Sequence, residues 1–157
     1  MRTDRESIGA AMGRIPSGCC ILTVEHAGQR TGVLVSWVQQ AAFEPLSISV
    51  CVKKGRPAVE LMERARRFLL NVVGEDPAAM FRHFGRGFGP EEDAFAGIRT
   101  EATAFGPLLP ECIAHLGCEL TQSLDVGDHL LYIASVIAGA GGGNQPYVHL
   151  RKSGLSY

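Results

Sequence analysis

The pattern of apolar positions changes from helical to strand-like after the first 18 residues of the chain. Four apolar side chains share one helical face within residues 4–15, which predicts an N-terminal helix that ends before Pro16. Two short β-branched runs follow at 19–24 and 31–38, with turn-forming residues at 26–29 between them. This arrangement predicts a β-hairpin.

Prolines mark the expected starts of two further helices. Pro57 precedes apolar residues at helical spacing and a cluster of arginines, which suit the negative end of a helix dipole. Asp76 and Pro77 predict an N-cap and a first helical residue, and Gly85 predicts the end of that helix. Residues 68–73 lie between the two helices and have the pattern of a strand.

Strand-like runs dominate the rest of the chain. Residues 46–52 and 112–120 are predicted to form strands. In residues 130–138, both odd-numbered and even-numbered positions are apolar, as in a strand covered on both faces. The Gly-rich segment 138–146 predicts a surface turn that leads into a short strand at 147–150. About seven strands with peripheral helices predict a mainly β (α+β) fold, an antiparallel barrel, with an α/β sandwich as the alternative.

The length and composition favour a single globular domain over residues 1–157. Of the 157 residues, 46% are hydrophobic and 20% are charged, which excludes a disordered or fibrous chain. The net charge of -1 argues against nucleic acid or an anionic membrane as the main partner, because both select clustered Lys and Arg. Glycine is abundant, with 19 residues, as expected where tight turns or close ligand contacts are needed.

The cysteines predict neither a disulfide framework nor a metal site. There are five, two of them vicinal, and neither a secretory leader nor a membrane-length apolar run accompanies them. We therefore expect a soluble, cytoplasmic protein with reduced thiols. Cys112, His115 and Cys118 are spaced as in some metal sites, but on a strand the two cysteines share a face and His115 points away.

Residues 31–54 contain the first segment that could bind a ligand. An apolar strand ends there in Ser36 and Trp37 and is followed by Gln39 and Gln40. An aromatic wall with a few hydrogen-bonding groups suits a flat heteroaromatic ligand. The alternative is that Trp37 fills the core and that the glutamines are solvated.

Two further segments could contribute to a binding site. The basic turn 53–57, with the sequence Lys-Lys-Gly-Arg-Pro, precedes a predicted helix, so its cations and the helix N-terminus could bind a phosphate. A solvated basic turn is the alternative. Gly127, Asp128 and His129 precede the most apolar strand. The imidazole of His129 could face a ligand, or Gly-Asp could simply form a hairpin turn.

Six short motifs, taken in order, resemble the flavin reductase-like family, the FMN-binding split barrels. The resemblance extends from Ile8 to Tyr157. It implies an antiparallel split β-barrel with peripheral helices. The motifs are GRIPSG at 13–18, GVLVSW at 32–37, EP at 44–45, RFLLNV at 67–72, FAGI at 95–98 and GDH at 127–129.

The likeness is greatest to the reductase module at the C-terminus of diflavin flavoproteins, at residues 36–45, 81–84 and 151–157. One difference lies in the expected flavin strand, where Leu34 and Val35 replace the Thr-Ala that is usual in the family. A threonine hydroxyl that could contact a flavin is therefore lost, although main-chain contacts would remain.

The resemblance implies that FMN, or FAD, binds near the boundary between the subunits of a homodimer. It places Ser36 at the flavin ring and His129, as the catalytic candidate, where the flavin and nicotinamide rings meet. It also places the basic turn at the phosphate. The full set of cofactor-binding residues that it implies is Leu34, Val35, Ser36, Trp37, Gln39, Gln40, Lys54, Arg56, His83 and Lys152.

Two functions remain open from the sequence. The first is an NAD(P)H-dependent flavin reductase, in which a hydride passes from nicotinamide C4 to flavin N5 and the reduced flavin is supplied to a partner such as a monooxygenase. The second is an FMN-holding electron-transfer protein that is reduced by a protein donor such as a rubredoxin-like partner. The short Gly-rich loops give little sign of a dedicated dinucleotide pocket, which keeps the second function open.

Overall fold

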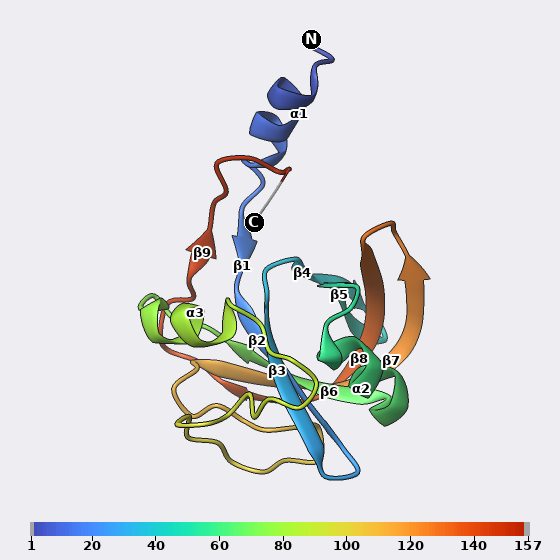
Figure 1. Cartoon of the computed structure of the whole chain (residues 1–157), viewed down its shortest axis with the longest axis vertical. Helices are drawn as coiled ribbons and strands as arrows, with labels where there is room; N and C mark the ends of the chain where they lie inside the picture. Colours follow the sequence, from blue (N-terminus) through green and yellow to red (C-terminus); the bar gives the residue numbers. More distant parts are fainter. Residues whose placement is uncertain (1, 156–157) are drawn as a thin grey trace.

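The computed structural model describes residues 2–155 and contains a seven-stranded sheet in which all neighbouring strands are antiparallel (Figure 1). The strands, in their order across the sheet, are β3 (Gln29–Val35), β2 (Cys20–His26), β6 (Arg67–Val72), β7 (Ala114–Asp125), β8 (His129–Gly141), β5 (Leu46–Lys53) and β4 (Val38–Phe43).

The strand order explains why the sheet forms a barrel. β3 and β4 stand at opposite edges of the sheet, yet only Ser36 and Trp37 connect them. Such a connection spans at most about 11 Å, because successive Cα atoms are ~3.8 Å apart, so the sheet must curl until its edges approach each other. No ladder joins β3 to β4 within residues 2–155. We call this opening, where Ser36 and Trp37 link the two edges, the seam. The predicted antiparallel split barrel is confirmed, and the α/β alternative is excluded.

Two helices pack against the barrel. α2 (Pro57–Ala65) has its proline in the first turn, as predicted, and contacts β2 and β3. α3 (Ala78–Phe84) ends at Gly85 as predicted, but it begins one residue late, because Pro77 rather than Asp76 occupies the N-cap position. The buried helical side chains are Ala58, Leu61, Met62, Met80 and Phe84.

Residues 2–155 form two apolar cores, and β2 contributes to both. Alternate side chains of β2, such as Leu22 and Val24, point into the barrel, where they pack with Phe68 and Tyr132. Ile21, on the opposite face, belongs to a second core. This second core lies beneath α3 and the long loop that follows it, and it includes Cys19, Val73, Met80, Phe84, Phe88, Ala94, Phe95, Leu109 and Cys112.

An arm projects from the barrel and carries both ends of the described chain (Figure 1). It consists of α1 (Arg5–Met12), β1 (Ser17–Gly18), β9 (Val148–His149) and residues 150–155. β1 and β9 pair with each other in a separate two-stranded sheet. The amide of Gly154 donates a hydrogen bond of 2.7 Å to the carbonyl of Gly9, which ties the C-terminal segment to α1.

Most predicted elements occur where the pattern placed them. The hairpin is β2 and β3, and the strands predicted at 46–52, 68–73 and 130–138 are β5, β6 and β8. The N-terminal helix ends at Met12, earlier than expected. The strand predicted from Cys112 begins at Ala114, so Cys112 lies in the second core while Cys118 lies in the barrel, and the two do not share a face.

The Gly-rich segment begins as part of β8, which extends to Gly141, and only then becomes a turn. Among residues 2–155, no helix has the length and apolar character needed to cross a membrane.

Candidate functional site

A small cavity of about 170 Å³ opens at the seam. It lies between the end of β3, the end of β5 and the C-terminal end of α3, so the curl of the sheet creates it. All four residues from Leu34 to Trp37 line it, as does Arg56. The complete lining is Val33, Leu34, Val35, Ser36, Trp37, Cys51, Val52, Lys53, Arg56, Phe84 and Gly85.

A larger cavity of about 540 Å³ adjoins the small one. Trp37 and Lys53 line both cavities, so they form a shared wall. The larger cavity lies between the barrel and the arm, and its remaining lining residues are Arg5, Asp128, His129, Arg151, Gly154 and Leu155. Two ligands could therefore occupy neighbouring spaces that meet beside Trp37 and Lys53.

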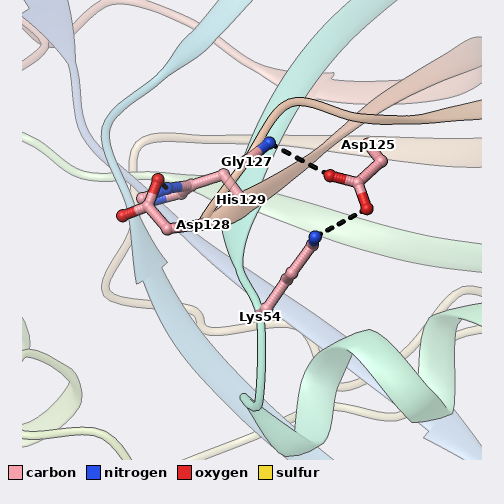
Figure 2. A network of polar contacts seen from close by, with 5 residues as sticks. All are labelled: Lys54, Asp125, Gly127, Asp128 and His129. Atoms are coloured by element: carbon pink, nitrogen blue, oxygen red, sulfur yellow. Dashed lines mark hydrogen bonds and ion pairs between the residues drawn. The ribbon is translucent and has the colours of Figure 1, made fainter.

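His129 is held in a fixed orientation beside Trp37. The residue is 3% exposed, and the centroids of the His129 and Trp37 rings are 4.6 Å apart at an angle of 44°. His129 Nδ1 lies 2.8 Å from Asp128 Oδ1 (Figure 2). This hydrogen bond lowers the pKa of Asp128. When the ring is neutral, a proton on Nδ1 leaves Nε2 as the acceptor nitrogen.

Lys54 forms an ion pair away from both cavities. Its Nζ lies 2.6 Å from Asp125 Oδ2, and the other carboxylate oxygen accepts a 3.0 Å hydrogen bond from the amide of Gly127 (Figure 2). The hydrogen bond from Lys54 lowers the pKa of Asp125. The neighbouring Lys53, which belongs to the predicted basic turn but not to the cofactor-binding set that the resemblance implies, lines both cavities instead.

Arg56 brings a positive charge to the small cavity from the start of α2, where it occupies the N-cap position. Its guanidinium packs against Gly87, which has a φ of 74°. A Cβ at Gly87 would overlap that guanidinium. The positive φ favours glycine at this position, and the missing side chain leaves the space that the Arg56 guanidinium occupies.

Arg151, in the C-terminal segment, lines the larger cavity and contacts Ser36 in the lining of the small one. Its Nη2 donates hydrogen bonds to Ser36 Oγ at 2.9 Å and to Ser17 Oγ at 3.5 Å. Its guanidinium lies over the Trp37 ring, 5.1 Å from the centroid. The resemblance points to residues 151–153 at the rim of the flavin site, but nothing local in the sequence indicates that Arg151 reaches a residue 115 positions away.

The other predicted site residues lie outside both cavities. Gln39 and Gln40 are exposed on β4, and Lys152 is exposed in the arm. His83 Nε2 lies 2.8 Å from the carbonyl of Ala94, and its ring packs against the second core. The structure therefore brings together residues 34–37, Arg56 and His129. Cys51, Phe84 and Gly85 complete the small cavity, although the sequence did not single them out.

The sequence matches a known domain family and parts of several larger proteins. The chain matches the model of the flavin reductase like domain over residues 12–154. The putative diflavin flavoprotein A 3 of Nostoc sp. is 36% identical over 160 residues, which cover 97% of this chain and 28% of that protein. The putative diflavin flavoprotein A 2 of Synechocystis sp. is 40% identical over 134 residues, which cover 84% of this chain and 23% of that protein. The chain spans about a quarter of the length of these relatives.

Solved structures share the fold. The NADH:FAD oxidoreductase SgcE6 of Streptomyces globisporus C-1027 superposes with a TM-score of 0.83 at 20% identity, covering 91% of this chain and 86% of that chain. The styrene monooxygenase flavin reductase of Pseudomonas putida S12 superposes with a TM-score of 0.77 at 25% identity, covering 90% of each chain. With the family match extending over most of its length, the chain belongs to the flavin reductase-like domain family.

Proposed function

We propose that this chain is an FMN-binding oxidoreductase that acts as an NAD(P)H:flavin reductase, transferring a hydride from nicotinamide to flavin N5. The observation that carries the proposal is the pair of adjoining cavities with Trp37 and Lys53 in their shared wall. Hydride transfer requires two rings held at roughly 3–3.5 Å. Trp37 cannot lie between the two rings at that distance, so the proposal places their contact beside Trp37, where the two cavities adjoin.

The small cavity fits a flavin in the chemistry of its lining. Val33, Val35 and Val52 offer apolar contact to a flat ring, and Ser36 supplies a hydroxyl. Arg56 offers a guanidinium suited to a phosphate oxygen. A bound flavin would supply the hydride acceptor, and the protein would supply binding and orientation. FMN is the flavin we favour, with FAD as the alternative.

His129 orients the second ring in this proposal. Asp128 fixes the imidazole, and Trp37 packs against it, so His129 presents a firm wall at the place where the two ligands would meet. We assign it contact with the nicotinamide and no proton transfer. The structural relative SgcE6 has been solved in complex with NAD and FAD fragments, which supports a nicotinamide nucleotide as the second ligand.

A second candidate function is an FMN-holding electron-transfer protein that a rubredoxin-like donor reduces. Trp37 favours this alternative, because it lines the small cavity and is 37% exposed. A protein donor could approach a flavin beside this exposed ring. Both functions use the same flavin site, and they differ in whether a nicotinamide nucleotide is the reductant.

The two functions are separated by anaerobic reduction. The purified protein is titrated with FMN, and binding is followed by flavin absorbance and fluorescence. NADH or NADPH is then added without oxygen. We expect rapid bleaching of the flavin band with at least one nucleotide. Bound FMN that neither nucleotide reduces would favour the electron-transfer function, whereas no FMN binding would exclude both.

The phosphate assignment is tested with Arg56→Gln. A charge-assisted hydrogen bond contributes about 1.5–3 kcal/mol, so the affinity for FMN should fall roughly tenfold to hundredfold. Riboflavin, which has no phosphate, should bind as before. Lys54→Gln tests the other predicted cation, whose charge already pairs with Asp125, and Arg99→Gln serves as an exposed control. Equal losses for FMN and riboflavin in Arg56→Gln would contradict the assignment.

Ser36→Ala tests the ring contact. We expect weaker binding of FMN and riboflavin alike, because the serine hydroxyl lines the small cavity beside the proposed ring position. An unchanged affinity for both flavins would remove Ser36 from the site.

A further inference from the structure

The hydroxyl of Ser36 has one hydrogen-bond partner among residues 2–155, the guanidinium of Arg151. Arg151 Nη2 donates to Ser36 Oγ at 2.9 Å, and a longer bond of 3.5 Å from the same nitrogen reaches Ser17 Oγ. Ser36 lines the small cavity, whereas Arg151 and Ser17 do not. Arg151 therefore contacts a residue of the proposed flavin site from outside that site.

This contact determines how the Ser36 hydroxyl can act. A guanidinium carries only donors, so Ser36 Oγ must be the acceptor in the bond. The serine keeps one proton of its own, which it can donate in another direction. Within residues 2–155, Ser36 Oγ makes no further hydrogen bond that would use this proton. A ligand in the small cavity, which Ser36 lines, could accept it.

We propose that Arg151 is a positioning residue for the flavin site, because its bond to Ser36 Oγ holds the serine hydroxyl as a donor to an acceptor atom of the flavin ring. This inference rests on the proposed binding of a flavin in the small cavity, and it applies whichever reductant the protein uses. Arg151 needs no contact with the flavin for this role, since it acts through Ser36.

The charge of Arg151 makes Ser36 a stronger donor. No carboxylate of residues 2–155 forms an ion pair with the guanidinium, so no neighbouring negative charge offsets it there. Burial lowers the pKa of His149, and the nearby Arg151 charge lowers it further. Hydrogen bonds in a chain polarise one another. A serine that accepts from a cation therefore donates its own proton more strongly.

This polarisation should favour the reduced flavin over the oxidised one. Reduction adds electron density to the flavin ring, and a donor aimed at an acceptor atom of the ring stabilises that density. Ser36, with Arg151 behind it, would therefore raise the reduction potential of bound FMN. The protein would supply orientation and electrostatics, while the flavin would supply the redox chemistry.

The arm keeps Arg151 in the position that this role requires. Arg14 donates a 3.4 Å hydrogen bond to the main-chain carbonyl of Arg151. A Cβ at Gly13 would lie 2.7 Å from the same carbonyl oxygen, so α1 and the C-terminal segment are closely packed there. The guanidinium lies over the Trp37 ring, which restricts its orientation as it donates to Ser36.

The reduction potential of bound FMN tests this role and is measured by anaerobic titration against a redox dye of known potential. Arg151→Gln removes the charge and places a group beside Ser36 that can accept as well as donate. We expect the affinity for reduced FMN to fall about tenfold relative to that for oxidised FMN, which lowers the potential by about 30 mV. Arg151→Lys keeps a charged donor and should recover part of the shift.

Three single variants accompany this measurement. Ser36→Ala should lower the potential by a similar amount, because it removes the donor itself. Ser17→Ala is the matched control, since it removes the other hydroxyl that Arg151 contacts but lines neither cavity. It should leave the potential unchanged, as should Arg99→Gln, which removes an exposed positive charge outside both cavities.

The double variant Ser36→Ala with Arg151→Gln separates positioning from a direct effect of charge. If Arg151 acts through Ser36, Arg151→Gln should produce no further shift once the hydroxyl is gone. An equal shift with and without Ser36, or no shift in either background, overturns the inference. Should Arg151→Gln not fold, Arg151→Lys replaces it in the same comparison, with a smaller shift that also requires Ser36. A protein that binds no FMN contradicts the proposed function instead.

Discussion

Cys51 differs from the other four cysteines in its surroundings. It is half-buried in the wall of the small cavity, whereas the others lie in the two cores. Burial raises the pKa of Cys19 to about 11 and the pKa of Cys20, Cys112 and Cys118 to about 12. Burial also raises the pKa of Cys51. Because the thiolate is the reactive form, access and pKa together make Cys51 the most reactive thiol.

Alkylation should therefore report on the small cavity. With iodoacetamide at pH 8, we expect Cys51 to be modified first, and FMN at ten times its Kd should slow that reaction roughly tenfold, because only the unoccupied protein is accessible. Peptide mass spectrometry measures the rates. Cys51→Ser provides the control and should leave no rapidly modified thiol. A Cys51 rate that saturating FMN does not change would exclude a flavin from this cavity.

Individual site residues were predictable only where a local motif carried them. Ser36 and Trp37 end a recognisable strand, and both line the small cavity. The choice between Lys53 and Lys54 depends on where β5 ends: Lys53 is its last residue, and Lys54 lies beyond it and pairs with Asp125, 71 positions away. Arg151 reaches Ser36 across 115 positions, and no local pattern indicates such a contact.

Among the elements, the contact between α1 and the C-terminal segment controls the position of Arg151. Gly13 has helical dihedral angles, with φ of -62° and ψ of -14°, so alanine causes no backbone strain there and should favour the helix. Its Cβ would nevertheless meet the carbonyl oxygen of Arg151. Gly13→Ala is thus a means of moving Arg151 without changing any cavity side chain.

The single tryptophan of the chain makes this displacement measurable. Because Arg151 stacks on Trp37, Gly13→Ala should change the tryptophan fluorescence in the same direction as Arg151→Gln does. Gly89→Ala is the matched control, since a Cβ there has no heavy atom within 4 Å. If Gly13→Ala gave the fluorescence of the unmodified protein, the arm would not position Arg151.

The helices and strands were largely predictable, because residues close in sequence, such as proline and glycine, determine where they begin and end. Pro57 and Gly85 mark a helix start and a helix end in the structure as they do in the sequence. Errors occurred where a tertiary contact decides the boundary. α1 ends at Met12 although apolar spacing continues to Ile15, and its C-cap, Gly13, packs against the C-terminal segment.

For the molecule as a whole, the arm exposes apolar side chains that a monomer would leave in water. Ile8, Met12, Ile15, Val148 and Leu150 are between 45% and 62% exposed. Clustered exposed apolar residues often mark an association surface, which supports the homodimer that we expect from the family resemblance.

Light scattering coupled to gel filtration measures the association. We expect a mass near twice the 16.8 kDa of one chain, and Ile15→Glu should shift the protein toward the monomer, because a buried carboxylate without a partner is costly. Glu91→Gln, an exposed change away from the arm, should leave the mass unchanged. A monomer at micromolar concentration in the original protein would contradict the expectation.

The overall architecture was predictable from strand count and family resemblance, but the strand order was not. Adjacent strands such as β2 and β3 pair locally, and their hairpin is visible in the sequence. The separation of β3 and β4 to opposite edges arises from pairings such as β2 with β6 and β5 with β8. Those pairings depend on side-chain packing across the whole barrel rather than on any short segment.

The seam allows local opening of the barrel at its two margins. Its margins, β3 and the β4–β5 hairpin, are joined by a short connection but share no ladder within residues 2–155, so each can open separately. A molecule in the small cavity would touch both margins at once. Amide hydrogens along β3 and β5 should then exchange with deuterium more slowly, and by a similar factor, because a single bound molecule would hold the two margins together.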